Sequence, residues 1–165
     1  MPRVLIVLAA LLATTAACSV SVGGDEKLDT AEIEQVVAEG LATPDGPRVE
    51  EVRCPDDVEL SAGDRFACTA VIEGLDVEIE VTQEDDEGSV RWERVQAVLD
   101  LETARAVIAD GFAGDVEVDC GGEAFAVAEP GDRLECRVTD AAGSVVVVTM
   151  TVSDVEGNVE LEVTG

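Results

Sequence analysis

An internal repeat constrains the fold of this 165-residue chain more than any other feature. The segment from Leu28 to Ala42 aligns with the segment from Leu99 to Ala113 at a constant offset of 71, and several positions are identical. Later blocks align with small changes of offset and bring two cysteine pairs into register. Such self-similarity indicates a duplicated structural unit. We therefore expect two modules, at residues 28–95 and 96–165.

Each module is predicted to open with a helix. In the first module, apolar residues recur at the three- and four-residue spacing of one helix face, and Asp29 with Glu32 fits an N-terminal capping box. In the second module, Ala104, Val107 and Ile108 repeat the same stripe, and Asp100 is the candidate cap. Gly40 and Gly111 are expected near the helix ends.

Strands are predicted to follow each helix. The segment from Leu75 to Val81 alternates apolar and acidic residues without a break, which is typical of a half-buried antiparallel strand. Acidic turns ending at Gly88 and Gly157 precede the last strand of each module. The predicted fold class is α+β, with two tandem modules that each pack one helix on a four-stranded antiparallel sheet in the order α-β-β-β-β.

Four of the five cysteines are predicted to form one disulfide in each module. Cys54 pairs with Cys68 and Cys120 with Cys136, because each pair lies on the first two strands of its module and an exported chain meets oxidising conditions. The alternative is a metal or redox site. The spacing is far from C-x-x-C and the chain has no histidine, so we expect neither a metal site nor a cofactor.

The fifth cysteine, Cys18, follows a segment with the features of a secretory signal peptide. Arg3 precedes nine apolar residues, too few to span a bilayer, and small residues follow. The stretch Ala16-Ala17-Cys18 resembles the bacterial lipobox, although Thr15 departs from its aliphatic preference. We expect a lipoprotein signal peptide at residues 1–17 and a lipidated N-terminus with a tether at 18–27. The alternative is an ordinary secreted protein.

Composition excludes several classes of function. Without histidine there is no Ser-His-Asp or Cys-His catalysis. A formal net charge of −27 argues against nucleic acid as a partner. Hydrolysis by a pair of carboxylates is not excluded, because 37 acidic residues offer many pairs. No motif singles out one of these pairs. We therefore name no catalytic residue and do not expect an enzyme.

The first module contains a distinctive set of cysteine, glycine and aromatic positions. These are the run Cys54-Pro55-Asp56-Asp57-Val58, Gly63 with Phe66-x-Cys68, Gly74, and Gly88-x-Val90-x-Trp92. In this pattern the module resembles a small domain of unknown function found in secreted and lipid-anchored proteins of actinobacteria. The resemblance is weaker in the second module, where Leu134 stands in place of Phe66. It supports an envelope location and the disulfide, and it implies no catalytic residue.

Three surfaces are candidates for function. The first is the acidic strand face of Asp76, Glu78 and Glu80, which could bind a cation or a basic partner. The alternative is a solvated sheet face without a ligand. The second is the acidic turn at residues 84–88, which could bind Ca²⁺ through its carboxylates. The alternative is an ordinary hairpin turn without a metal ion. The third is a strand that is apolar on both faces, which we expect to be covered by the first module or by another protein. Its central residues are Val145, Val146, Val147 and Val148.

The sequence thus predicts a non-catalytic binding protein of the cell envelope. It would be held at the extracytoplasmic face of the membrane by the lipid on Cys18, with an envelope protein as partner. The alternatives are a secreted inhibitor-like protein and a carboxylate-based hydrolase.

Overall fold

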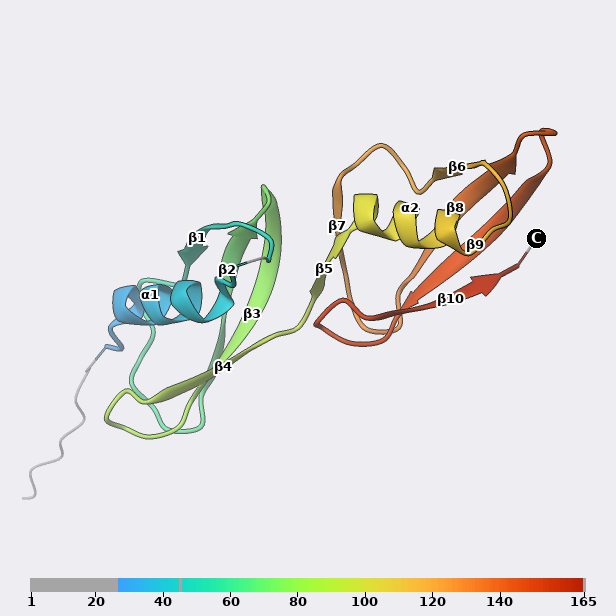
Figure 1. Cartoon of the computed structure of the whole chain (residues 1–165). Coiled ribbons are helices and arrows are strands. Elements are labelled where there is room, and N and C mark those ends of the chain that lie inside the picture. The colour runs from blue at the N-terminus through green and yellow to red at the C-terminus, as the bar shows by residue number, and fades with distance from the viewer. Residues whose placement is uncertain (1–26, 45, 165) are drawn as a thin grey trace, which may run out of the picture.

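The computed structural model describes residues 27–44 and 46–164, and it is an α+β structure with two helices, antiparallel sheets and two disulfides. Figure 1 shows two groups of elements, each with one helix on one face of a sheet, joined through a short strand. We call residues 27–96 the first half and residues 97–164 the second half.

The first half carries α1 (Thr30–Leu41) and a sheet of four consecutive antiparallel strands. These are β1 (Val49–Arg53), β2 (Arg65–Ile72), β3 (Leu75–Gln83) and β4 (Val90–Arg94). The helix begins after Asp29, whose Oδ1 accepts the Glu32 N–H at 3.3 Å. The predicted helix, cap and alternating strand are therefore present.

The core of the first half lies between α1 and one face of this sheet. The helix buries only Ile33 and Val37, while alternate residues of β2 and β3 supply the rest. Trp92 on the edge strand β4 packs against this core and lies against Gly40, where an added Cβ would clash with its ring. Trp92 therefore fills the seam between the Gly40 end of the helix and the last strand.

The second half carries α2 (Leu101–Asp110) and a four-stranded sheet in the order β10-β9-β8-β6. Its strands are β6 (Val116–Asp119), β8 (Arg133–Asp140), β9 (Val145–Val152) and β10 (Val159–Val163). The helix buries Leu101 and Ile108 against this sheet. Asp100 caps the helix, as the sequence predicts.

The predicted strand order of the second half is wrong in one respect. Two further strands, β5 (Ala97–Asp100) and β7 (Phe125–Ala128), pair antiparallel in a small separate sheet. β5 directly precedes α2, and β7 lies in the connection between β6 and β8. Segments this short carry too few residues for a periodic signal, and their pairing depends on contacts across the chain.

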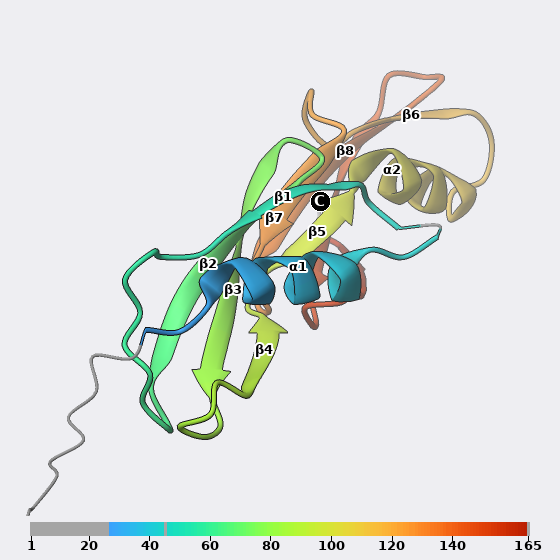
Figure 2. The ribbon, with the colours of Figure 1, turned by 90° about the vertical axis from the view of Figure 1, so that its left-hand side faces the viewer.

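The small sheet joins the two halves. Val98 of β5 and Val127 of β7 pack against the hydrophobic core of the first half, although they belong to the second. Just before them, Gln96 accepts the Glu78 N–H at 2.9 Å and so holds the connection to β3. Figure 2 shows the same junction from the side, with the loop after α1 reaching toward α2. The halves therefore share buried surface.

The close contact between Gly40 and Trp92 gives a stability prediction. Gly40→Ala should lower the free energy of unfolding by about 1–3 kcal/mol, because the added methyl group overpacks the ring and outweighs the gain in helix propensity. Urea unfolding followed by the fluorescence of Trp92, the only tryptophan, measures the change.

Gly111→Ala is the matched control. Gly111 has φ −76° at the end of α2, and an added Cβ there would meet only backbone carbonyls, with Ile108 O nearest at 3.2 Å. Its free energy of unfolding should change by less than about 1 kcal/mol. An equal loss in both variants would contradict the role assigned to Trp92.

Candidate ligand groove

Each disulfide fastens the start of its sheet. The bonds join Cys54 to Cys68 and Cys120 to Cys136, which are the pairs that the sequence predicts. Cys68 and Cys136 are buried on β2 and β8, and their partners follow β1 and β6. Both bonds are thus part of the hydrophobic cores. The two disulfides stabilise the fold and do not line the groove described below.

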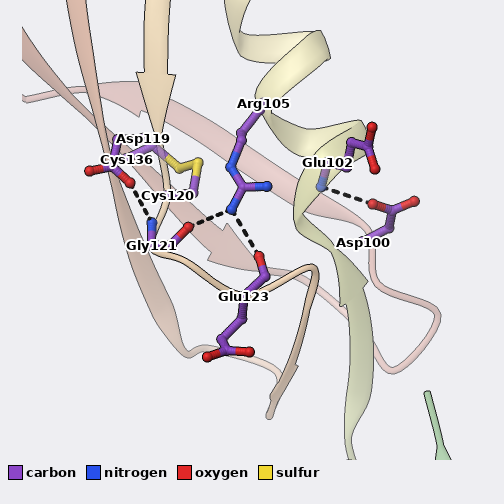
Figure 3. Close-up of a disulfide and its surroundings, with 8 residues drawn as sticks. All are labelled: Asp100, Glu102, Arg105, Asp119, Cys120, Gly121, Glu123 and Cys136. Atoms are coloured by element: carbon purple, nitrogen blue, oxygen red, sulfur yellow. Dashed lines mark hydrogen bonds between the residues drawn. A yellow bond between two sulfur atoms is a disulfide. The ribbon is translucent and has the colours of Figure 1, made fainter. Parts of the chain in front are cut away.

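One helix side chain in each half holds the backbone near the first cysteine. Glu34 accepts the Cys54 N–H at 2.7 Å. In the second half, Arg105 of α2 donates to the carbonyls of Gly121 and Glu123, at 2.5 and 2.9 Å, beside the Cys120–Cys136 bond (Figure 3). These contacts fix each helix relative to its sheet. The helix side chain accepts the hydrogen bond in the first half and donates the hydrogen bonds in the second.

A groove of about 450 Å³ lies between α2 and the edge strand β10. Its floor is apolar and includes the buried Met150 and the half-buried Phe125. Its walls include Val107 on the helix and Leu161 on the strand, which are 55% and 43% exposed. This volume is within the range of small-molecule and side-chain binding sites. Gly46, Pro47 and Glu73 of the first half complete it.

Three carboxylates border this apolar groove: Glu73, Asp100 and Glu156. The lining that the structure describes contains no lysine or arginine. Glu73 lies in the β2–β3 turn, where its Oε1 accepts the Arg48 N–H at 2.6 Å. Glu156 lies in the turn before β10. The groove therefore combines an apolar floor with an acidic rim.

Asp100 is positioned by the start of α2. Its Oδ1 accepts the N–H groups of Glu102 and Thr103 at 2.9 and 3.0 Å, and its Oδ2 accepts the Thr103 hydroxyl at 2.8 Å. These bonds, led by that from the Thr103 N–H, hold the pKa of the Asp100 carboxyl below its ordinary value. The carboxylate stays ionised at neutral pH and serves the helix as its cap.

The turn that carries Glu156 is rigid for a similar reason. Asp154 accepts the N–H groups of Glu156 and Asn158 at 3.1 Å each and the Asn158 side-chain amide at 2.7 Å. The Asn158 side chain, followed by its backbone N–H, lowers the pKa of the Asp154 carboxyl. The acidic rim is thus held in place by the folded turn.

A second groove, of about 440 Å³, lies at the corresponding place in the first half. It runs between α1 and β4, and Lys27, Asp29, Glu32 and Glu87 line it. Charged side chains of both signs therefore border this groove. The groove of the second half is distinguished by its larger share of apolar residues and by its purely acidic charge.

The apolar strand predicted as an interaction surface is β9, and its two faces differ. Val146 and Val148 point into the core of the second half. Val145 is 53% exposed, and Val147 is half-buried beside residues that all come from the second half. Among the described residues, the ones of the second half that pack on the first core are Val98 and Val127, and neither belongs to β9.

The acidic residues singled out from the sequence are either exposed or bound to nearby groups. Asp76 and Glu78 are exposed, while Glu80 is paired with Arg65 at 2.9 Å. In the acidic turn, Asp85 accepts the N–H groups of Glu87 and Ser89, as a turn-forming aspartate does. Within residues 27–44 and 46–164, no group of three or more side chains is placed to hold a metal ion.

Cys18 lies outside the described residues, as does most of the expected tether. Among the helices that the structure describes, none is long and apolar enough to cross a membrane.

The groove itself was not predicted from the sequence. Two signals pointed to it: Val107 occupies a helix position that the apolar stripe treats as buried, and Leu161 stands where the first module has Trp92. Neither signal alone predicts a groove, because a groove forms only if the helix lies at some distance from the edge strand, and the sequence does not give this distance.

Comparison with known proteins assigns part of the chain. Residues 13–88 match a domain of unknown function, DUF4333, which confirms that the chain contains a domain of this kind. The matched segment contains α1 and β1 to β3 and stops just before β4. The chain matches no curated protein and no solved structure.

The cap at Asp100 gives a pH-dependent prediction. Asp100→Ala should lower the free energy of unfolding at pH 7 by about 1 kcal/mol, because the first N–H groups of α2 lose their acceptor. The pKa of Asp100 is depressed in the folded state, so its contribution is present above the unfolded pKa and is lost as the pH falls through the folded pKa. Urea unfolding at pH 7 and below pH 3.8 tests both statements.

The control is Asp115→Ala, which removes an exposed acidic residue from the loop before β6. It should leave the unfolding free energy nearly unchanged at both pH values. A deficit for Asp100→Ala that stays constant on acidification would contradict the role of the ionised cap.

Proposed function

We propose that this chain is a lipid-anchored envelope protein made of two copies of one module, and that it binds its ligand in the groove of the second copy. The observation that carries the binding function is the apolar groove between α2 and β10, open on the surface of a highly acidic protein. Exposed apolar surface with few polar groups around it is typical of binding sites.

The pairing around each helix start supports duplication. In the first half, Lys27 forms an isolated antiparallel bridge with Glu59. The repeat places Val98 and Val127 at these positions, and they face one another in the β5–β7 pair. The small sheet is thus an extended form of a bridge present in both copies. The pair is apolar only in the second copy, where it contacts the first core.

The difference between the two grooves supports a specialised second copy. Trp92 pairs with Val81 in the register of β4 and β3, and Leu161 pairs with Met150 in β10 and β9. The smaller Leu161 and Ala104 replace Trp92 and Ile33 of the first copy. These replacements make the side chains on both sides of the same seam smaller. The groove of the second copy reaches Leu161 and Met150, whereas the equivalent Trp92 and Val81 do not line the groove of the first copy.

Binding accounts for the groove better than hydrolysis does. A glycosidase-type pair needs one carboxylic acid with a raised pKa facing an ionised partner. The groove does hold Glu73, Asp100 and Glu156. However, Asp100 has a lowered pKa and its oxygens accept three hydrogen bonds from the helix start. Glu73 likewise accepts the Arg48 N–H. Two of the three carboxylates thus serve the fold.

The envelope location rests on the N-terminal sequence. Lipidation of Cys18 would explain the fifth cysteine, because the other four are joined in two disulfides. Two acyl chains on one residue give stable anchoring, and disulfides persist in the oxidising conditions outside the cytoplasm. The acidic surface would keep the folded part away from anionic lipids.

Filling the groove tests the binding function. The full chain should bind the neutral dye Nile red with a blue-shifted emission, because the groove excludes water from an apolar site. Ala104→Phe should weaken dye binding by about tenfold or more, since Ala104 lines the groove. A fluorescence titration measures this.

Ala106→Phe places the same side chain on an exposed position of α2 that is not part of the groove lining. Its dye affinity should equal that of the unchanged protein. The binding function fails if the unchanged protein does not bind the dye, or if both variants bind it equally.

The anchor has a separate test. After expression in a bacterium that processes lipoproteins, Cys18→Ser should move the protein from the membrane fraction to the soluble fraction. Mass spectrometry of the unchanged protein should find Cys18 at the N-terminus carrying acyl chains. A free, unmodified Cys18 thiol in the mature protein would refute the anchor.

A further inference from the structure

We infer that the open edge of β10 binds an extended peptide in which apolar and basic residues alternate. The peptide adds a strand to the sheet and places its apolar side chains in the groove. This inference rests on the proposed ligand groove and names the chemistry of its ligand. Strand addition of this kind takes affinity from main-chain hydrogen bonds and specificity from alternate side chains.

The backbone of β10 is prepared for such pairing. β10 is an edge strand, with β9 on one side only. Thr164 N donates to Val147 O, and Asn158 O accepts the Ser153 N–H, so the even-numbered residues of this segment face β9. In an antiparallel strand the next residues face the other way. The N–H and C=O groups of Val159, Leu161 and Val163 therefore point to the open edge.

The side chains of these same residues lie on the core side of the sheet, where the groove is. Val159, Leu161 and Val163 pair with Val152, Met150 and Val148, which belong to the core of the second half. Val159 and Leu161 line the groove, and Val163, beyond them, is 59% exposed. A peptide strand beside β10 would place alternate side chains against this apolar row and Val107.

Charge selects the other side chains of the peptide. The outer face of β10 carries Glu160 and Glu162, and no ion pair of either residue occurs among the described residues. The equivalent positions on β4 hold Arg91 and Glu93, whose charges face each other at 4.0 Å. Basic side chains on the outer face of the added strand would therefore be attracted to β10 more than to β4.

The same charges argue against a second copy of this chain as the occupant. Two β10 strands paired edge to edge would bring Glu160 and Glu162 of both chains to one face. Like charges on neighbouring strands are destabilising, and each chain also carries a formal charge of −27. A basic peptide reverses this repulsion and approaches the acidic rim of Glu73 and Glu156 favourably.

The test uses the full chain and a synthetic peptide in which valine and lysine alternate over about ten residues. Hydrogen exchange should slow by about tenfold or more at the amides of Val159, Leu161 and Val163, because added-strand bonds protect them. The amides of β4 (Val90–Arg94) should be unaffected. Two control peptides replace lysine by glutamate, or group the same valines and lysines in two blocks.

Variants test the two faces separately. Leu161→Lys should weaken binding of the alternating peptide by about tenfold or more, through lost apolar contact and added repulsion. Glu160→Gln with Glu162→Gln should weaken it and reduce its dependence on salt. The matched control for Leu161→Lys is Val145→Lys, because Val145 is as exposed as Leu161 but lies on the other face of the sheet.

The outcomes separate this inference from the proposed function. Protection confined to β10, with binding lost in the control peptides, supports strand addition. Equal binding of the block peptide, or protection on β4, overturns it. If Nile red binds the groove but the alternating peptide leaves the β10 amides unprotected, the ligand groove stands and the peptide inference is wrong. If neither binds, both are wrong.

Discussion

The seam between each helix and the last strand of its sheet governs the structure. Each helix buries only two large residues, so it covers a narrow part of its sheet and leaves the edge strand to close the remaining gap. In the first half Trp92 fills the part of this gap beside Gly40, where the absence of a side chain makes room for its ring. The groove of that half lies nearer the start of the helix, and Trp92 does not line it. In the second half the smaller Leu161 lines the groove itself, together with Met150 beneath it.

The junction between the halves depends on one pair of positions that is polar in the first half and apolar in the second. The paired positions before the helix and after the first cysteine are Lys27 and Glu59 in one half and Val98 and Val127 in the other. The polar pair lies at the end of the described structure that faces no other sheet, while the apolar pair packs on the first core. Burying the valines stabilises the junction through the hydrophobic effect.

Much of the fold could be predicted from the sequence because its signals are local. Asp29 and Asp100 as caps, the alternation from Leu75 to Val81 and the cysteine spacing each depend on residues near in sequence. The β5–β7 pair could not be predicted, because it depends on contacts between segments distant in the chain. The groove could not be predicted either, because the exposure of Leu161 depends on where α2 lies.

The most direct test of this account is Leu161→Trp, which places in the second half the ring that fills the seam beside Gly40 in the first. Gly111 stands at the helix position equivalent to Gly40 and should leave room for the ring. We predict that the free energy of unfolding rises by about 1–2 kcal/mol and that Nile red binding weakens by about tenfold or more. Unchanged stability together with unchanged dye binding would contradict the account.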